Sequence, residues 1–211
     1  YNKSTVLYHM TNIDGIKIRN FDKIKKKYNL KKKFFYLPNH FWKHKNHIVV
    51  YKAINYLKKR NIEVCLIATG SSKDYRFPKH FFELNSFIKK HNLENNIRIL
   101  GIVSLNDVYS LIKNSLAVIN PSLFEGWGNT LEHAIKFNKI AIVSNIDVHR
   151  ERISKNKILF NPSNYKDLAK VMMKIIRKPK EIRKLNKHAH ENEFNSFGKS
   201  YIKIIKNILN L

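Results

Sequence analysis

The segment 120–134 contains a carboxylate and two glycines, and it begins where an apolar run ends. The run 116–120 ends before Pro121, and Glu125 then precedes the triplet 126–128, which reads Gly-Trp-Gly. Glycine lets a backbone approach a ligand closely, and N–H groups at the start of a helix can hold a diphosphate. Glu125 is suited to accept hydrogen bonds from sugar hydroxyls. A tight turn with a surface carboxylate is the competing interpretation, and spacing alone favours neither.

Other side chains with possible chemistry are three histidines and one cysteine. His40, His44 and His47 are accompanied by no nearby carboxylate or cysteine, so separate polar roles are expected rather than a metal site. Cys65 lies in the apolar run 63–68, which indicates a small core residue. A single cysteine also excludes an intrachain disulfide.

The segments that position these residues alternate between strand-like and helix-like patterns. Short β-rich runs predict six strands, at 34–37, 63–69, 97–100, 116–120, 140–143 and 158–160. Apolar residues at helical spacing predict helices at 46–60, 78–91, 129–137, 165–177, 180–190 and 197–209, and one opening at an N-cap on Ser104. This alternation predicts right-handed βαβ units in an α/β, Rossmann-like, doubly wound parallel sheet. Such sheets bind ligands at the carboxyl ends of their strands, where the strand order reverses.

The segment 120–134 resembles the donor-site signature of the large "glycosyl transferases group 1" family. These are retaining GT-B enzymes such as sucrose synthase and many bacterial glucosyl- and mannosyltransferases. Their pattern is Pro-Ser, an acidic residue, Gly-aromatic-Gly, and a second Glu eight residues after the first. Further segments are similar in the same order, so the resemblance covers residues 34–211; they are 38–47, 69–72, 101–103, 144–151 and 194–211.

The resemblance implies roles for named residues. Glu125 would orient the transferred sugar, and Lys45 would stabilise the leaving diphosphate. The residues implied to bind the nucleotide sugar are His40, Gly70, Ser71, Val103, Gly126, Trp127, Gly128, Asn129, Thr130, Glu132 and His133. The family needs no cofactor in this class of reaction, and no metal is expected.

The sequence departs from the family pattern at two places. Eight residues after Glu125 stands His133, with Glu132 one position earlier, so either side chain is a candidate for holding the ribose. The family's phosphate-binding arginine is replaced by Asn39 or His40.

The expected domain organisation is a connector with a short helix from a missing N-terminal domain (1–33), a nucleotide-sugar-binding domain (34–193) and a C-terminal helix packing back toward that missing domain (194–211). The chain starts at Tyr1, has no secretory signal and has no apolar run near the ~20 residues that span a bilayer. We therefore expect a piece of a larger cytoplasmic protein, inactive without its acceptor half.

The charge of the chain is strongly positive. Lys and Arg number 41 against 15 Asp and Glu, for a net charge of +26. Such a field attracts anionic lipid, which predicts peripheral contact with the inner face of the membrane. Codon usage in an AT-rich genome explains the lysines equally well. No nucleic-acid partner is expected.

The predicted function is transfer of a hexose, with retention, from a UDP- or GDP-sugar to a glycan or lipid-linked acceptor in cell-surface polysaccharide biosynthesis. Two alternatives remain open. One is a non-catalytic basic module that binds membrane or RNA, which would need neither Glu125 nor the paired glycines. The other is a GT-B nucleotide-sugar epimerase.

Overall fold

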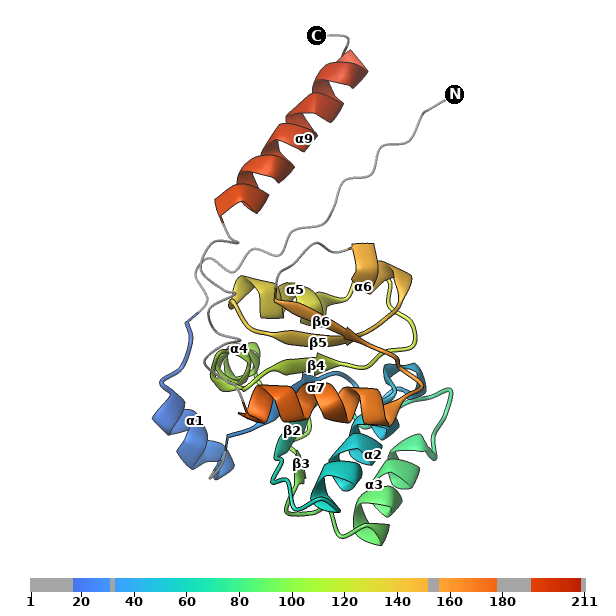
Figure 1. Cartoon of the computed structure of the whole chain (residues 1–211). Helices are drawn as coiled ribbons and strands as arrows, with labels where there is room; N and C mark the ends of the chain where they lie inside the picture. The colour runs from blue at the N-terminus through green and yellow to red at the C-terminus, as the bar shows by residue number, and fades with distance from the viewer. Residues whose placement is uncertain (1–16, 31–32, 152–155, 178–190, 210–211) are drawn as a thin grey trace.

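The computed structural model describes residues 17–30, 33–151, 156–177 and 191–209. Its centre is a six-stranded sheet in which all strands are parallel and follow the order β3-β2-β1-β4-β5-β6 (Figure 1). The strands are β1 (Phe35–Pro38), β2 (Leu66–Thr69), β3 (Ile97–Ile99), β4 (Val118–Asn120), β5 (Ala141–Ser144) and β6 (Lys157–Phe160). Each overlaps a predicted strand, and the predicted α/β parallel sheet is confirmed.

The helices are α1 (Phe21–Tyr28), the 3-10 turn η1 (Lys43–Lys45), α2 (His47–Lys58), α3 (His80–Lys90), α4 (Leu105–Asn114), α5 (Asn129–Lys136), α6 (Asp147–Glu151), α7 (Tyr165–Arg177) and α9 (Glu191–Leu209). The predicted N-cap of α4 is confirmed, since Ser104 Oγ accepts a hydrogen bond from Asp107 N at 3.3 Å. The sequence does not predict η1 and α6, because helices of three to five residues are too short for a 3.6-residue period to be detected. The helix predicted at 180–190 lies outside the described residues, as do residues 1–16 of the predicted connector.

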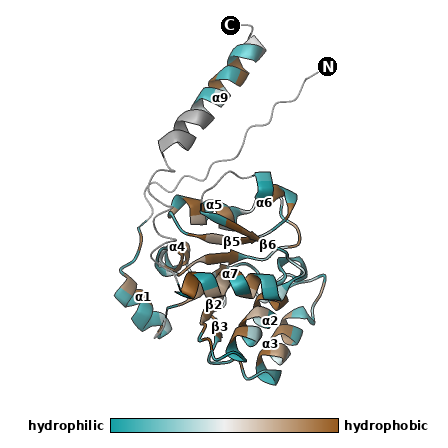
Figure 2. Ribbon diagram, viewed as in Figure 1, coloured by the Kyte–Doolittle hydropathy of each residue, from teal (hydrophilic) through white to brown (hydrophobic). Residues whose placement is uncertain are grey.

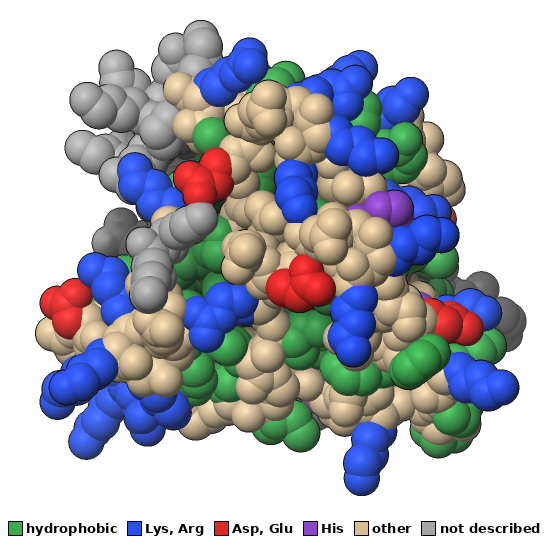
Figure 3. Space-filling view, turned by 90° about the horizontal axis from the view of Figure 1, so that it is seen from below, with side chains coloured by type: hydrophobic (Ala, Val, Ile, Leu, Met, Phe, Trp, Pro, Cys, Tyr) green, Lys and Arg blue, Asp and Glu red, His purple; other side chains and the backbone are tan. Residues whose placement is uncertain are grey.

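The helices bury one apolar stripe and expose a polar one, a pattern visible in Figure 2. In α2, Val50, Ile54 and Leu57 are buried while Lys52 is exposed. On the face seen in Figure 3, Lys and Arg side chains are numerous and acidic side chains are few. In the described part of the chain, no helix combines the length and apolar character needed to cross a bilayer.

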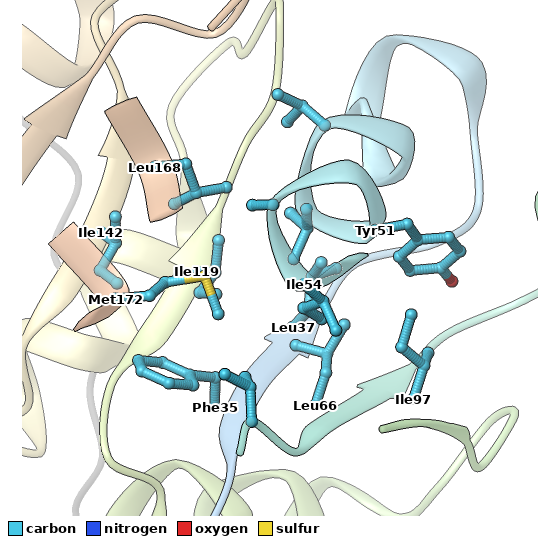
Figure 4. Packing of buried hydrophobic residues seen from close by; sticks show 14 of the residues in the cluster. Phe35, Leu37, Tyr51, Ile54, Leu66, Ile97, Ile119, Ile142, Leu168 and Met172 are labelled. Atoms are coloured by element: carbon cyan, nitrogen blue, oxygen red, sulfur yellow. The ribbon is translucent and has the colours of Figure 1, made fainter. Parts of the chain in front are cut away.

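Side chains of each strand alternate between two apolar cores, one on each face of the sheet. In β1, Phe35 and Leu37 enter the core formed with α2, α3 and α7, and Tyr36 enters the core formed with α1, α4 and α5. Figure 4 shows the first core, where Ile54 of α2 and Met172 of α7 lie over the strands. Both faces are therefore covered, as a parallel sheet requires.

The short helix expected within residues 1–33 is α1, and it packs on the second core. Asn20 Oδ1 caps its start by accepting from Asp22 N at 2.7 Å. Ile24 is 1% exposed in the second core, and Leu30 joins the same cluster just beyond the helix.

The strand order places β1 between β2 and β4. The connection from β1 continues outward on one side to β2 and β3, and the chain then returns to add β4 on the other side. The order therefore reverses at β1 and β4, and the crevice beyond their carboxyl ends is where doubly wound sheets bind ligands.

Candidate functional site

Buried amide and hydroxyl groups connect the carboxyl ends of β1 and β4. Asn39 follows β1 and donates from Nδ2 to Asn120 Oδ1 at 3.1 Å. Thr130, in the first turn of α5, donates from Oγ1 to Asn39 Oδ1 at 2.9 Å. All three side chains belong to buried residues, so each hydrogen bond satisfies a polar group removed from water. The chain of hydrogen bonds holds the start of α5 against both strand ends.

Two glycines allow the backbone to come close at this edge of the sheet. Gly70 has φ +144°, and a Cβ there would lie 2.4 Å from the carbonyl oxygen of Asn39. Gly128 caps α5 with φ +81°, a left-handed conformation that side chains disfavour. Glycine is thus required at Gly70 by contact and at Gly128 by conformation.

Lys45 reaches the site through the turn between β1 and α2. Asn46 follows it with φ 53°, and its Nδ2 donates to the carbonyl oxygens of Pro121 and Pro162 at 3.2 and 3.0 Å. The carbonyl of His44 accepts from Leu123 N at 2.8 Å. The bonds with Pro121 and Leu123 join the turn after β1 to the loop after β4, which carries the carboxylate of the predicted site, and the bond with Pro162 joins it to the loop after β6.

The two predicted catalytic side chains contact each other directly, although 80 residues separate them in sequence. Lys45 Nζ lies 2.8 Å from Glu125 Oε1 and 2.9 Å from Oε2. Their side chains are 15% and 9% exposed, so the ion pair is largely shielded from water. At this burial the pair is much less screened by salt than a surface pair.

Neighbouring polar groups hold the Glu125 carboxylate in place. Ser122 Oγ lies 2.7 Å from Oε1, and Asn120 Nδ2 donates to the same oxygen at 3.2 Å. Burial by itself would raise the pKa of Glu125, but hydrogen bonds from Lys45 and Ser122 bring that pKa below its ordinary value. The carboxylate is therefore ionised at neutral pH.

These groups open into a pocket of about 470 Å³, termed here the switch-point pocket. Its walls come from the loops after β1, β2, β3 and β4 and from the first turns of α4 and α5. The lining residues are Pro38, Asn39, His40, Trp42, Lys45, Thr69, Gly70, Ile102, Val103, Leu105, Val108, Glu125, Trp127, Gly128, Asn129, Thr130 and His133. The volume suits a ligand of nucleotide size.

Most predicted site residues line this pocket, including Trp127 and the start of α5. Three do not. Ser71 stands behind His40, whose Nδ1 accepts from Ser71 N at 2.9 Å. Gly126 lines a neighbouring hollow, which Glu125 lines as well. Glu132 is 1% exposed on α5 and is absent from the pocket wall.

His133 is the member of the Glu132–His133 pair that lines the pocket. Its ring packs edge-on against Tyr109 with centroids 5.2 Å apart. Burial lowers the pKa of His133, so the imidazole is neutral at pH 7. The neutral ring has one donor and one acceptor to offer a ligand.

The three histidines near β1 occupy different environments. His40 lines the pocket, His44 packs beside Trp42 at 5.6 Å, and His47 stacks on Phe41 at 4.5 Å in the core. Burial lowers the pKa of His47 to about 3, so this side chain is neutral. Among the described residues, no three His, Cys, Asp or Glu side chains are grouped as a metal site requires.

His149 is a buried histidine behind the pocket. Its Nδ1 lies 2.9 Å from the carbonyl oxygen of Ser144, and its Nε2 lies 3.4 Å from Asn120 Nδ2. Burial lowers the pKa of His149 despite the opposing Ser144 contact. The buried His149 ring therefore packs against the Asn120 side chain, and we interpret it as a structural histidine.

Asn120 and Ser122 lie in the segment that carries the signature, but the sequence assigns neither of them a role in the site. Both are buried polar residues at the end of β4, and both contact the Glu125 carboxylate. A polar side chain directly after a buried parallel strand is the signal that points to them.

Comparison with known proteins identifies similar sequences. The family model described as "Glycosyl transferases group 1" matches residues 19–192. The O-antigen chain mannosyltransferase RfbU of Salmonella typhimurium is 25% identical over 166 residues, which cover 79% of this chain and 45% of that protein.

Solved structures share the fold. A glycosyltransferase from Rickettsia africae superposes with a TM-score of 0.72 at 21% identity, over 89% of this chain and 51% of the other. Anabaena HepE in complex with UDP and glucose gives a TM-score of 0.80 at 16% identity, over 96% and 56% of the two chains. The chain thus spans about half the length of the relatives it matches.

Proposed function

The chain belongs to the glycosyl transferases group 1 family, and from this membership we propose that the switch-point pocket binds a nucleoside-diphosphate hexose. The observation that carries the proposal is the convergence of Lys45, Glu125 and the start of α5 on one pocket. A cation and a helix N-terminus are suited to a diphosphate, and a carboxylate is suited to sugar hydroxyls.

In the proposed complex, Lys45 and the N–H groups at Gly128 to Thr130 hold the diphosphate. Charge develops on this group as the bond to the sugar breaks, and pre-positioned donors stabilise such charge strongly. Glu125 accepts hydrogen bonds from the sugar, with Trp127 beside it. His133 contacts the ribose, and the loop that carries Val103 contacts the base.

We propose UDP- or GDP-sugars as donors and retaining transfer to a glycan or lipid-linked acceptor. Anabaena HepE is described in complex with UDP-glucose, which supports a uridine base. The Salmonella relative is named as a mannosyltransferase of the O-antigen chain, which supports a polysaccharide acceptor. The acceptor wall and any catalytic base belong to the whole protein and are part of this proposal.

Thermal shift with a ligand panel tests the donor site. The 211-residue chain is heated with UDP, GDP, UDP-glucose, GDP-mannose and, as controls, uridine and guanosine. A ligand at 100 times its dissociation constant adds about 2.7 kcal/mol, roughly 5–10 °C of melting temperature for a chain of this size. We expect one base series to give this shift and the nucleosides to give less. Absence of a shift with every diphosphate at millimolar concentration would refute the donor site.

A further inference from the structure

The charged side chains that the structure describes in the switch-point pocket are one cation and one anion that neutralise each other. Among the described residues that line it, Lys45 and Glu125 are the only Lys, Arg, Asp or Glu side chains. Both oxygens of the carboxylate are bonded to the ammonium, and neither side chain is more than 15% exposed. The cation proposed to bind phosphate is therefore already neutralised by the carboxylate proposed to bind sugar.

A diphosphate that enters this pocket must take Lys45 away from Glu125. The Glu125 carboxylate cannot follow Lys45 toward the phosphates, because hydrogen bonds from Ser122 and Asn120 hold Oε1 in the loop. It would keep these two hydrogen bonds but lose its cation, and a shielded carboxylate beside the phosphates without a countercharge is costly.

We propose that Glu125 makes the site discriminate between the sugar-carrying donor and the bare nucleoside diphosphate. This inference rests on the proposed function. The hydroxyls of a donor sugar can donate to Glu125 and replace the hydrogen bonds from Lys45. A bare diphosphate has only acceptors at this position, and its terminal phosphate, with a second pKa near 6, carries an additional negative charge at pH 7.

Discrimination of this kind also favours release of the product. Once the sugar has been transferred, Ser122 and Asn120 still bond to Oε1, and among the described residues that line the pocket Lys45 is the one cation that can neutralise the Glu125 carboxylate. Re-forming the 2.8 Å ion pair removes the cation from the diphosphate and restores the arrangement seen in the structure. Glu125 thus competes with the diphosphate for Lys45. The donor overcomes this competition because its sugar hydroxyls bond to Glu125, and the product lacks those hydroxyls.

The test is the Glu125→Gln variant, which keeps the shape of the side chain and removes its charge. Calorimetric titration measures the affinities of wild type and variant for UDP and UDP-glucose, and for GDP and GDP-mannose. The two proteins are compared for the base whose nucleotides bind wild type. We expect the bare diphosphate to bind the variant at least about tenfold more tightly, a modest effect for relieving one like-charge contact at short range. The preference for sugar diphosphate over diphosphate should fall by a larger factor.

Glu83→Gln is the matched control, because it removes a carboxylate that is 67% exposed on α3 and lies outside the pocket wall. It should leave both affinities unchanged. If Glu125→Gln does not fold, judged by its melting curve, Glu125→Ala replaces it with the same expected direction. Unchanged or weaker diphosphate binding by the folded variant overturns this inference while the donor site stands. Failure of every nucleotide to bind wild type overturns both.

Discussion

At the pocket wall, one residue step on α5 separates a ligand-facing side chain from a buried one. His133 lines the pocket, while Glu132 is 1% exposed and turned toward the interior. Consecutive residues of an α-helix point about 100° apart, which is consistent with His133 lining the pocket while Glu132 does not. His133, which stands where the family pattern has its second Glu, therefore faces the pocket, and the neighbouring carboxylate of Glu132 does not line it.

Substitution of His133 by Ala should weaken nucleotide binding by about 0.5–1.5 kcal/mol, the range for a hydrogen bond between neutral groups. Because burial lowers the pKa of His133, its contribution should stay constant from roughly pH 7 to 8. Calorimetric titration with the bound nucleoside diphosphate at these pH values measures both effects.

Glu132→Gln is the companion variant. It should lower the melting temperature and leave nucleotide affinity unchanged, since Glu132 does not line the pocket. Weaker binding by Glu132→Gln, with no effect of His133→Ala, would reverse the assignment of the ribose contact.

Among the secondary-structure elements, α1 is fastened to α4 by a buried carboxylate. Asp107 has a fully buried side chain, and its Oδ2 accepts from Lys27 Nζ at 2.5 Å and from Tyr28 OH at 2.7 Å. Arg19 Nε lies 3.3 Å from the other oxygen. Burial alone would raise the pKa of Asp107, but the bonds from Lys27 and Tyr28 bring it below its ordinary value.

Asp107→Asn should lower the free energy of unfolding by about 1.5–3 kcal/mol at pH 7, the range for hydrogen bonds to a charged group. A depressed carboxyl pKa gives stability that is present above the unfolded-state pKa and lost as pH falls through the folded-state pKa. The difference between wild type and variant should therefore be full at pH 7 and shrink below about pH 4. Urea unfolding of wild type and variant at pH 7 and below about pH 4 measures this difference in the free energy of unfolding. A difference that grows on acidification would contradict the ion-pair role of Asp107.

Across the whole molecule, the basic surface is the dominant electrostatic feature. The chain carries a net charge of +26, and Lys and Arg are spread over the face seen in Figure 3. A field of this sign attracts anionic lipid headgroups, and salt screens it over about 10 Å at 0.1 M.

We expect the chain to co-sediment with vesicles containing phosphatidylglycerol and not with pure phosphatidylcholine vesicles. Binding should weaken steeply between 0.1 and 0.5 M salt, because it depends on exposed charge. Equal sedimentation with both vesicle types would contradict an electrostatic contact. Tighter binding to RNA than to anionic vesicles at the same salt would point to the alternative basic-module function.

Much of the architecture follows from the sequence alone. The alternation of β-rich runs with helical spacing predicts all six strands, because strands of a parallel sheet covered on both faces are short, largely apolar runs without a polar face. The Pro-Ser and Gly-Trp-Gly pattern around Glu125 points to the loop at the correct edge of the sheet. Residues adjacent in sequence carry this information, so a sequence pattern is sufficient to detect it.

Contacts between distant segments, and the phase of a helix, needed the tertiary structure. Lys45 and Glu125 each stand in a predicted loop, but their pairing depends on β1 and β4 being neighbours and on Asn46 joining the two loops. The choice between Glu132 and His133 depends on where α5 begins and on which face packs against the second core. That phase is set by the left-handed Gly128 cap and by burial of Leu131 and its neighbours, which are properties of the packed chain.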